Sequence, residues 1–233
     1  MSNTRELAEL LEAERKADAL FAAIEAKQLV RPGRTETEVD RDIFDLAARE
    51  FGVKQHWHKR IVRTGPNTVQ IFAENPPIRV IEDEDTVFLD LGPVFGEWEA
   101  DVGRTYVMGR DPEKHRLVND LPRIFDLLKQ HFDDHPDLTG AELYAHAQHC
   151  ASHVGWLFGG AIAGHIVGEF PHARIPGDKD LYRISPANTG RMRDPDAVGN
   201  TRHWIIEVHL VDATRSFGGF YERLLLPGNV NIS

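Results

Sequence analysis

The sequence predicts an α+β fold, in which helices and strands do not alternate regularly along the chain. Helical runs occupy the N-terminal part and the middle, whereas strand-like runs lie between and after them. Two neighbouring strand-like runs, residues 86–91 and 97–107, are separated by a short turn, which is typical of an antiparallel hairpin. No linker, repeat or low-complexity segment divides the chain, so a single domain spanning residues 1–233 is expected.

The first expected helix opens the chain and ends at the segment Arg31-Pro32-Gly33. Its apolar residues recur at helical spacing, which predicts a helix half-buried on the domain surface. Glu14 and Asp18 interrupt this stripe, which otherwise consists of Leu7, Leu10, Leu11, Ala17, Leu20, Phe21 and Ile24.

Capping signals predict two more helices. Thr35 and Glu38 form a capping-box pattern that opens a helix ending at Gly52. Thr139, with Glu142 three residues later, repeats the same pattern.

The remaining elements follow from apolar spacing and turn residues. A helix is expected over residues 114–132, where Pro122 either kinks it or marks its first turn. A segment rich in Gly, Pro, Asp and Asn, residues 177–202, is expected to form a long surface loop. The strand-like runs are 60–64, 86–91, 97–107, 203–210 and 220–225.

Composition excludes several classes of partner. A net charge of −10 and a pI near 5.6 argue against nucleic acids and acidic membranes, which require concentrated basic residues. Cys150 is the only cysteine, which excludes an intramolecular disulfide and a cysteine-rich zinc site. The charged N-terminus lacks the apolar core of a secretory signal, and no window approaches the ~18 apolar residues of a membrane-spanning helix. A cytoplasmic setting is therefore expected.

Two aspartates give the first indication of function. In FLDLGPVFGEWEADVGRTY, Asp90 lies within an apolar strand pattern and Asp101 follows eleven residues later. If the chain reverses about Phe95-Gly96, the two aspartates face each other across a hairpin. Directly opposed like charges are destabilising, so a positive group is expected between them.

A second pair of carboxylates, Glu207 and Glu222, would face each other if the chain reverses midway between them. The segment AGHIVGEFPHARIP, between the two pairs, carries His165 and His172. Four carboxylates and a histidine in a partly buried site would not all stay ionised without a compensating cation. These ligands fit Mn, Fe(II), Co(II) or Zn better than a soft metal, and carboxylates able to bridge are compatible with a two-metal centre.

In their order and spacing, these segments resemble those of the methionine aminopeptidase, Xaa-Pro peptidase and creatinase superfamily. The likeness extends from the second expected helix almost to the C-terminus, through VRPGRTETEVD, RTGPNT, FLDLGPVFGEWEADVGRTY, GHIVGEFPHARIP, IIEVHL and GGFYERLLL. It implies the pita-bread fold, a curved antiparallel sheet flanked by helices, without the separate N-terminal domain of larger relatives.

The resemblance also implies two divalent metal ions, with the choice among Mn, Fe, Co and Zn left open. Glu207, besides being a ligand, would accept the proton of the metal-bound water and donate it to the leaving group. His172 would bind the scissile carbonyl oxygen and the oxyanion. A metal-bound water with hydroxide character would attack the carbonyl. The implied ligands are Asp90 on one ion, His165 and Glu207 on the other, and Asp101 and Glu222 bridging both.

The sequence departs from the superfamily pattern at Phe72 and at His209. Phe72 stands where hydrolytic members usually carry a substrate-contacting histidine, and its ring cannot hydrogen-bond a substrate amide. His56 or His58 could supply that function from a neighbouring loop, although we favour a simple surface position for both. His209, two residues after the fourth ligand, is either a second-layer partner or substrate contact, or a packing residue.

The expected function is that of a dinuclear-metal-dependent hydrolase, similar to an aminopeptidase or Xaa-Pro peptidase, that cleaves a C–N bond. Its cleft over the sheet would be lined by Phe72, Trp98 and His172. One alternative is a lyase or amidohydrolase acting on a small non-peptide substrate, which fits the loss of the histidine at position 72. Another is a non-catalytic binding relative. The expected partner is a small peptide or small molecule, and a homodimer is left open because relatives of this shape are often dimers.

Overall fold

An antiparallel sheet forms the centre of the computed structural model, which describes residues 3–226. Its strands are β1 Ile61–Thr64, β2 Thr86–Leu91, β5 Val102–Val107, β6 Leu157–Phe158, β7 Ile166–Val167, β8 His203–Val211 and β9 Gly218–Leu224. They lie in the order β1-β2-β5-β9-β8-β6, β7 pairs with β8, and each pairing is antiparallel. A separate hairpin joins β3 Val94–Phe95 to β4 Trp98–Glu99. This arrangement confirms the expected α+β class.

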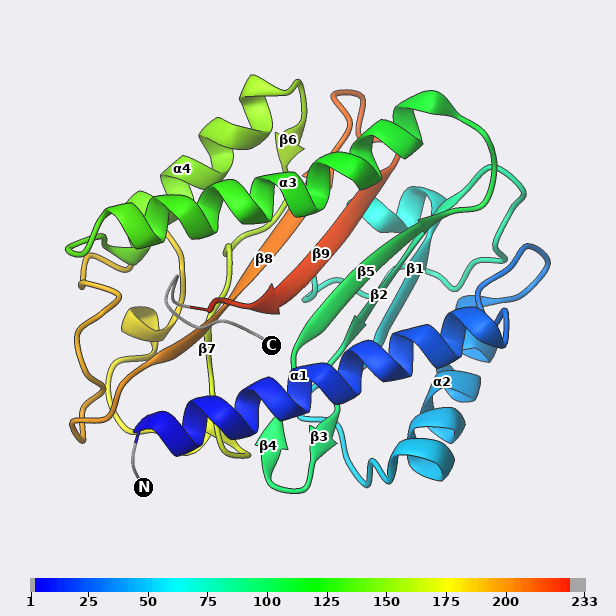
Figure 1. The fold of residues 1–233 in the computed structure, drawn as a ribbon. Helices are drawn as coiled ribbons and strands as arrows, with labels where there is room; N and C mark the ends of the chain where they lie inside the picture. The colour runs from blue at the N-terminus through cyan, green and yellow to red at the C-terminus, as the bar shows by residue number, and fades with distance from the viewer. Residues whose placement is uncertain (1–2, 227–233) are drawn as a thin grey trace.

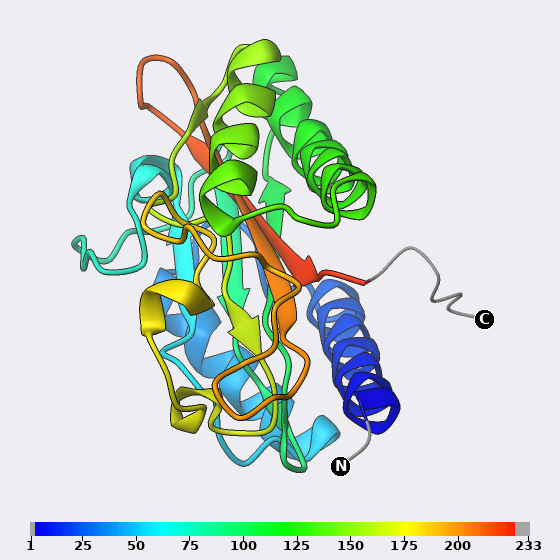
Figure 2. The same cartoon turned by 90° about the vertical axis from the view of Figure 1, so that its left-hand side faces the viewer.

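Helices cover one side of the sheet. They are α1 Asn3–Ala26, α2 Glu36–Phe51, α3 Pro112–Asp134 and α4 Gly140–His153. In Figure 1, α1 and α3 cross in front of the strands, and Figure 2 shows the segment 159–202 on the opposite side of the sheet. The site described below is therefore built between the sheet and this segment, whose helices are the short 3-10 helices His172–Arg174 and Lys179–Tyr182. Within the described residues, each helix is too short or too polar to span a membrane.

Two apolar clusters fix the helices on the sheet. Phe21 of α1 and Ile43 of α2 pack in one cluster with Leu89 of β2. Leu128 of α3 packs in the other with Val208 of β8. Each of these side chains is almost fully buried, and such burial contributes about 1.5–3 kcal/mol per side chain relative to exposure.

Both predicted capping boxes are confirmed. The Thr35 hydroxyl accepts from the backbone N–H of Glu38, whose carboxylate accepts from the backbone N–H of Thr35. The same reciprocal pair forms between Thr139 and Glu142 at the start of α4. The expected helix over residues 114–132 is also present, as α3, and Pro122 lies inside it rather than in its first turn.

The predicted register of the first hairpin is wrong. Asp90 lies opposite Gly103 rather than Asp101, because the tight turn falls one residue later than expected and pairs Phe95 with Trp98. The expected strand 97–107 is broken into β4 and β5, and Asp101 lies in the break.

The glutamate and aspartate that interrupt the first apolar stripe bind an arginine of the sheet. Glu14 is buried, and its Oε1 accepts from Arg223 Nε at 2.8 Å and from the Leu224 backbone N–H at 3.2 Å. Asp18 Oδ2 accepts from Arg223 Nη2 at 2.6 Å. Two breaks in the sequence pattern therefore attach α1 to β9.

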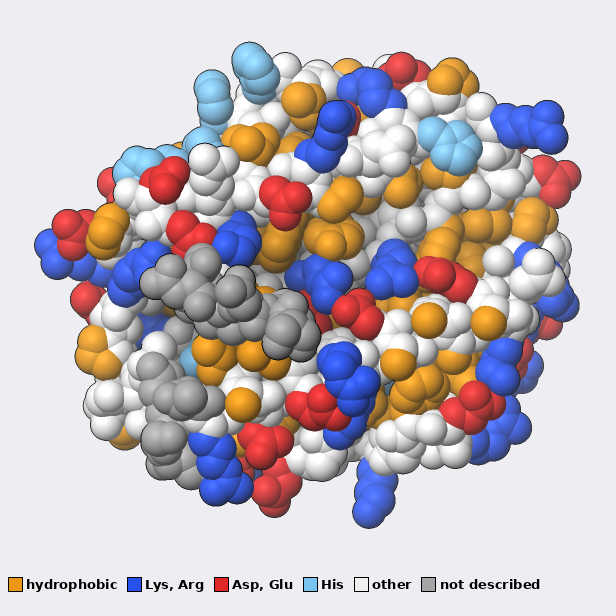
Figure 3. Space-filling model, in the orientation of Figure 1, with side chains coloured by type: hydrophobic (Ala, Val, Ile, Leu, Met, Phe, Trp, Pro, Cys, Tyr) orange, Lys and Arg blue, Asp and Glu red, His pale blue; other side chains and the backbone are white. Residues whose placement is uncertain are grey.

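The surface of the helical face is mixed in charge. Figure 3 shows Lys, Arg, Asp and Glu interspersed over this face, while histidines gather over the region of α4. There the rings of His131 and His146 stack with centroids 3.8 Å apart. On the other side, the expected surface loop 177–202 is only partly superficial, because Ile184 and Met192 within it are buried.

Candidate metal centre

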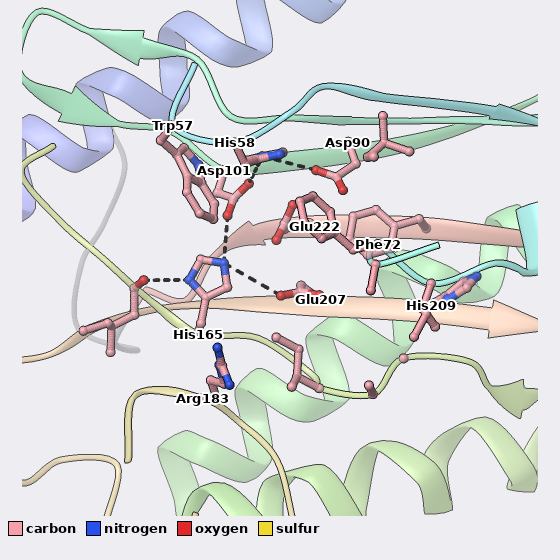
Figure 4. Close-up of a pocket in the computed structure, with 18 of the residues that line it drawn as sticks. Trp57, His58, Phe72, Asp90, Asp101, His165, Arg183, Glu207, His209 and Glu222 are labelled. Atoms are coloured by element: carbon pink, nitrogen blue, oxygen red, sulfur yellow. Dashed lines mark hydrogen bonds and ion pairs between the residues drawn. The ribbon is translucent and has the colours of Figure 1, made fainter. Parts of the chain in front are cut away.

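Three carboxylates lie in one row across the sheet. Asp90 of β2 lies opposite Gly103 of β5, which in turn lies opposite Glu222 of β9. Glu222 lies opposite Glu207 of β8, as the sequence predicted. Directly opposed residues project from the same face of a sheet, so the row brings these carboxylates to one face. Figure 4 shows them pointing into a common space.

The glycine in the middle of this row makes room for its neighbours. A Cβ added to Gly103 would lie 2.4 Å from the Phe220 ring and 3.1 Å from Cβ of Glu222. Side chains do not approach this closely, so the row requires a residue without a Cβ at this position.

Asp101 joins the row from the break before β5. Its Oδ2 lies 3.0 Å from Nε2 of His165, and its Oδ1 lies 3.2 Å from Nε2 of His58. Nε2 of His165 is also 3.9 Å from Oε1 of Glu207. The structure therefore brings the five predicted ligands together, although Asp90 and Asp101 do not face each other across the hairpin as expected.

His165 is positioned by the edge of β8. The Ile205 backbone N–H donates to the His165 carbonyl at 2.9 Å. The His165 ring Nδ1 lies 2.7 Å from the backbone carbonyl of Ile166. A carbonyl only accepts, so Nδ1 carries the hydrogen and Nε2 faces the carboxylates, which is the usual arrangement of a metal-ligating histidine.

Burial raises the pKa of three of the four carboxyl groups. It raises the pKa of Asp90 to about 7 and that of Glu207 to about 8, with neighbouring carboxylates adding to the effect. Burial also raises the pKa of Glu222 well above its ordinary value. The protein alone therefore supplies too little positive charge for the whole set of carboxylates to ionise.

Asp101 behaves in the opposite way. Burial alone would raise its pKa, but hydrogen bonds from His165 and His58 outweigh this effect and lower the pKa to about 2. Burial would likewise lower the pKa of His165, but Asp101 raises it to about 9. Asp101 is thus the carboxylate that stays charged between two imidazoles.

The donor set fits divalent cations. In the described part of the chain, two overlapping groups have ligand atoms within 4.8 Å of one another: His58 with Asp90 and Asp101, and Asp101 with His165 and Glu222. Oε2 of Glu222 is buried and has no hydrogen-bond partner. Such an oxygen is costly to bury unless a cation compensates it. Carboxylate oxygens with imidazole nitrogen suit Mn, Fe(II), Co(II) and Zn.

The carboxylates open into a cavity of about 590 Å³. His172 lines it, and Glu99 fixes its ring by accepting from the backbone N–H at 3.0 Å and from Nδ1 at 2.6 Å. Phe72 also lines the cavity and is half exposed, as expected for a residue at its mouth. The expectation for Trp98 is not met, because the tryptophan that lines the cavity is Trp57.

His209 is buried and hydrogen-bonded to the backbone, as expected for a packing residue. Its Nε2 lies 2.8 Å from the backbone carbonyl of Thr68. Burial lowers the pKa of His209 to about 4, so its ring is neutral at ordinary pH. Its ring still lines the cavity beyond Glu207, next to Phe88 and Phe220.

His58 is the residue of the candidate site whose position was predicted wrongly from the sequence. Only 6% of its side chain is exposed, and it lies between Asp90 and Asp101, not at the surface. The sequence signal was present in QHWHKR, two histidines just before a strand, but nothing there distinguishes His58 from His56. The ring of His56 instead lies 6.1 Å from that of Phe44, and neither of its nitrogens has a partner.

Four carboxylates and two imidazoles thus converge on one face of an antiparallel sheet, a donor set that suits divalent metal ions. The chain belongs to metallopeptidase family M24, whose profile matches residues 8–198.

Solved structures show the fold. A methionine aminopeptidase from Thermotoga maritima is 16% identical, with a TM-score of 0.72 over 97% of this chain and 94% of that one. A prolidase from Thermococcus sibiricus is 22% identical, with a TM-score of 0.71 over 97% of this chain and 57% of that one. The pita-bread fold expected from the sequence is thereby confirmed.

A curated relative is similar over a shorter segment. A protein of Mycoplasma pneumoniae, provisionally named Xaa-Pro aminopeptidase, is 25% identical over 122 residues, which are 52% of this chain and 34% of the relative. The chain thus matches about a third of that relative's length, and little more than half of the prolidase.

Proposed function

We propose that the chain is a divalent-metal-dependent hydrolase that cleaves the C–N bond of a small peptide near its amino end. The observation that carries this proposal is the convergence of the four carboxylates and His165 in one cavity. The ligands would be Asp90, Asp101, His165, Glu207 and Glu222. Ions bound there would lower the pKa of a water molecule and polarise the scissile carbonyl.

The protein's own groups supply proton transfer and orientation. Glu207 lines the cavity, and its Oε1 lies 3.9 Å from Nε2 of His165, so its carboxylate could take a proton from the nucleophile and return it to the leaving amine. His172 lies across the cavity, with one side of its ring fixed by Glu99, and would contact the carbonyl oxygen.

The walls of the cavity favour an apolar substrate group. Ile61, Phe88 and Phe220 form a buried cluster that lines the cavity beside the carboxylates. An apolar side chain placed there would lose contact with water, which contributes about 25 cal/mol per Å² of buried area.

Phe72 supports a second candidate, a metal-dependent lyase or amidohydrolase that acts on a small non-peptide substrate. Its ring lies at the cavity mouth, 5.6 Å from the His58 ring, and cannot donate to or accept from an amide. A substrate without a peptide group would need no such contact.

The test is turnover of a panel of dipeptides and tripeptides by protein reconstituted with Mn²⁺, Co²⁺ or Zn²⁺. We expect cleavage that releases the N-terminal residue, and loss of that activity by at least about 10³-fold in Asp101→Ala, because this carboxylate lies between His165 and His58 at the centre of the residues that would hold the metal. Circular dichroism shows whether the variant is folded.

The outcomes separate the candidates. Turnover of a non-peptide amide or ester, lost in Asp101→Ala and without cleavage of any peptide, would replace the first candidate by the second. Protein that takes up no divalent metal at all would exclude both.

A further inference from the structure

We propose that His58 is a sixth protein ligand of the metal centre, which gives each of the two ion positions one imidazole. The inference rests on the proposed metal-dependent function and adds a residue to the five ligands of that site. Asp101 would then lie between His58 on one ion and His165 on the other (Figure 4).

The distances around His58 are those between ligands of one ion. Its Nε2 lies 3.2 Å from Oδ1 of Asp101 and 3.4 Å from Oδ1 of Asp90. Two donors bound to one ion at about 2.0–2.1 Å are about 2.9–3.4 Å apart for right or tetrahedral angles. The distance from His165 to Asp101, 3.0 Å, lies in the same range.

The tautomer of His58 matches that of His165. Its Nδ1 lies 2.6 Å from the backbone carbonyl of Lys59, as that of His165 lies 2.7 Å from the carbonyl of Ile166. Each Nδ1 therefore donates to a carbonyl one residue later, and each Nε2 faces Asp101. A neutral ring held in this way presents a lone pair to the ion position.

The backbone fixes this loop beside the carboxylates. The Trp57 backbone N–H donates to the Gly92 carbonyl at 2.9 Å, and that of Val94 donates to the Gln55 carbonyl at 3.1 Å. A Cβ added to Gly92 would lie 2.3 Å from the His58 ring and 2.5 Å from Nε1 of Trp57. The chain therefore has glycine where the His58 ring passes the end of β2.

A hydrogen-bonding role alone explains the geometry less well. Nε2 carries at most one hydrogen, yet it faces oxygens of two carboxylates, and the 3.4 Å separation from Asp90 is longer than an ordinary N–H···O bond. A cation shared by Asp90, Asp101 and His58 uses all three donors at once.

X-ray absorption of the wild-type protein loaded with two equivalents of cobalt(II) chloride tests the proposal directly. We expect an average of one imidazole per cobalt ion. An average of half an imidazole per ion would overturn the proposal. Limiting the metal to two equivalents fills the tightest positions first, ahead of surface histidines such as His131 and His146.

Calorimetric titration with cobalt(II) of His58→Gln and the matched control His56→Gln provides the second measurement. We expect His58→Gln to bind one of the two ions at least about 10-fold more weakly and to lose one imidazole per pair of ions, while His56→Gln keeps both wild-type affinities. Equal affinities in wild type and His58→Gln would overturn the proposal. If the wild-type protein binds two ions with only one imidazole between them, the ligand role of His58 is rejected, but the proposed hydrolase function is not. If the protein binds no cobalt, both the ligand role of His58 and the proposed metal-dependent function are rejected.

Discussion

Asp101 links the two halves of the candidate centre through its two oxygens. His58 lies 3.2 Å from one oxygen and His165 lies 3.0 Å from the other. These contacts cross long sequence separations and depend on the break between β4 and β5. At the residue scale, the place of Asp101 in the candidate site could be predicted from the sequence, whereas its contact with His58 could not.

Phe72 lines the cavity and is half exposed, so a substrate entering the site would pass its ring. Replacing it with histidine places a hydrogen-bonding group at the cavity mouth, where a substrate amide or amine would pass. We expect Phe72→His to raise kcat/KM for dipeptides by about 10-fold, the size of one hydrogen bond of about 1.4 kcal/mol.

The control for this prediction is Phe72→Leu, which removes the ring and adds no polar group. Steady-state kinetics on one dipeptide series compares the variants. If His and Leu at position 72 change kcat/KM equally, the missing hydrogen bond does not limit peptide cleavage.

At the scale of elements, the site depends on strand register. The row Asp90, Gly103, Glu222 and Glu207 crosses β2, β5, β9 and β8, so a slip of one residue in β2, β9 or β8 would turn its carboxylate to the helical face. The pairing of Glu207 with Glu222 could be predicted because the two strands are joined by one simple hairpin. The register of β2 with β5 could not, because the short hairpin of β3 and β4 lies between them.

The short strands β6 and β7 also could not be predicted from the sequence. β6 and β7 each have two residues, too few for an apolar alternation to be recognised. They exist because β8 offers hydrogen-bonding groups along its edge, which is a property of the folded sheet. β7 nevertheless matters for the candidate site, since His165 immediately precedes it.

Gly103→Ala tests the close packing within the row. The added Cβ would displace the Phe220 ring and Glu222, so we expect a loss of about 1–3 kcal/mol in the free energy of unfolding and weaker metal binding. Thermal unfolding and cobalt titration measure the two effects.

Gly168→Ala is the matched control, because a Cβ there would meet only Ile175, at 3.9 Å. We expect it to retain both stability and metal affinity. Equal behaviour of the two variants would show that the row tolerates a side chain at position 103.

At the scale of the whole molecule, the centre joins the two halves of the sheet. Asp90 comes from the strand beside the α1–α2 cluster, and Glu207 comes from β8, which packs on α3 and α4. The overall α+β architecture and the capped helices followed from local sequence signals, whereas the meeting of the two halves depends on long-range packing. Cations bound between them should therefore stabilise the fold as well as the site.

The metal-free protein is expected to lose stability as pH rises from about 5 to 9. The folded-state pKa values of His58 and His165 are raised to about 9, so their stabilising effect is present below the ordinary value of 6.5 and lost toward pH 9. The pKa of Glu207 is raised to about 8, so folding also disfavours its ionisation above its ordinary value of 4.5.

Thermal unfolding of chelator-treated protein across this pH range measures the effect. We expect the melting temperature to fall with pH, and added Mn²⁺ to reverse most of the fall, because cations stabilise the ionised carboxylates. A melting temperature that rises with pH in metal-free protein would contradict the electrostatic account of the site.

The position of Trp57 has a practical consequence. Its ring centroid lies 4.4 Å from that of His58, 5.1 Å from that of His165 and 4.8 Å from that of His172, and its Nε1 has no hydrogen-bond partner. Protonated imidazoles quench indole emission, so replacing the proton of His58 or His165 by a metal ion should alter the light that Trp57 emits. We therefore expect metal binding to change the tryptophan emission of the protein in real time and without a label, and this change should disappear in Trp57→Phe.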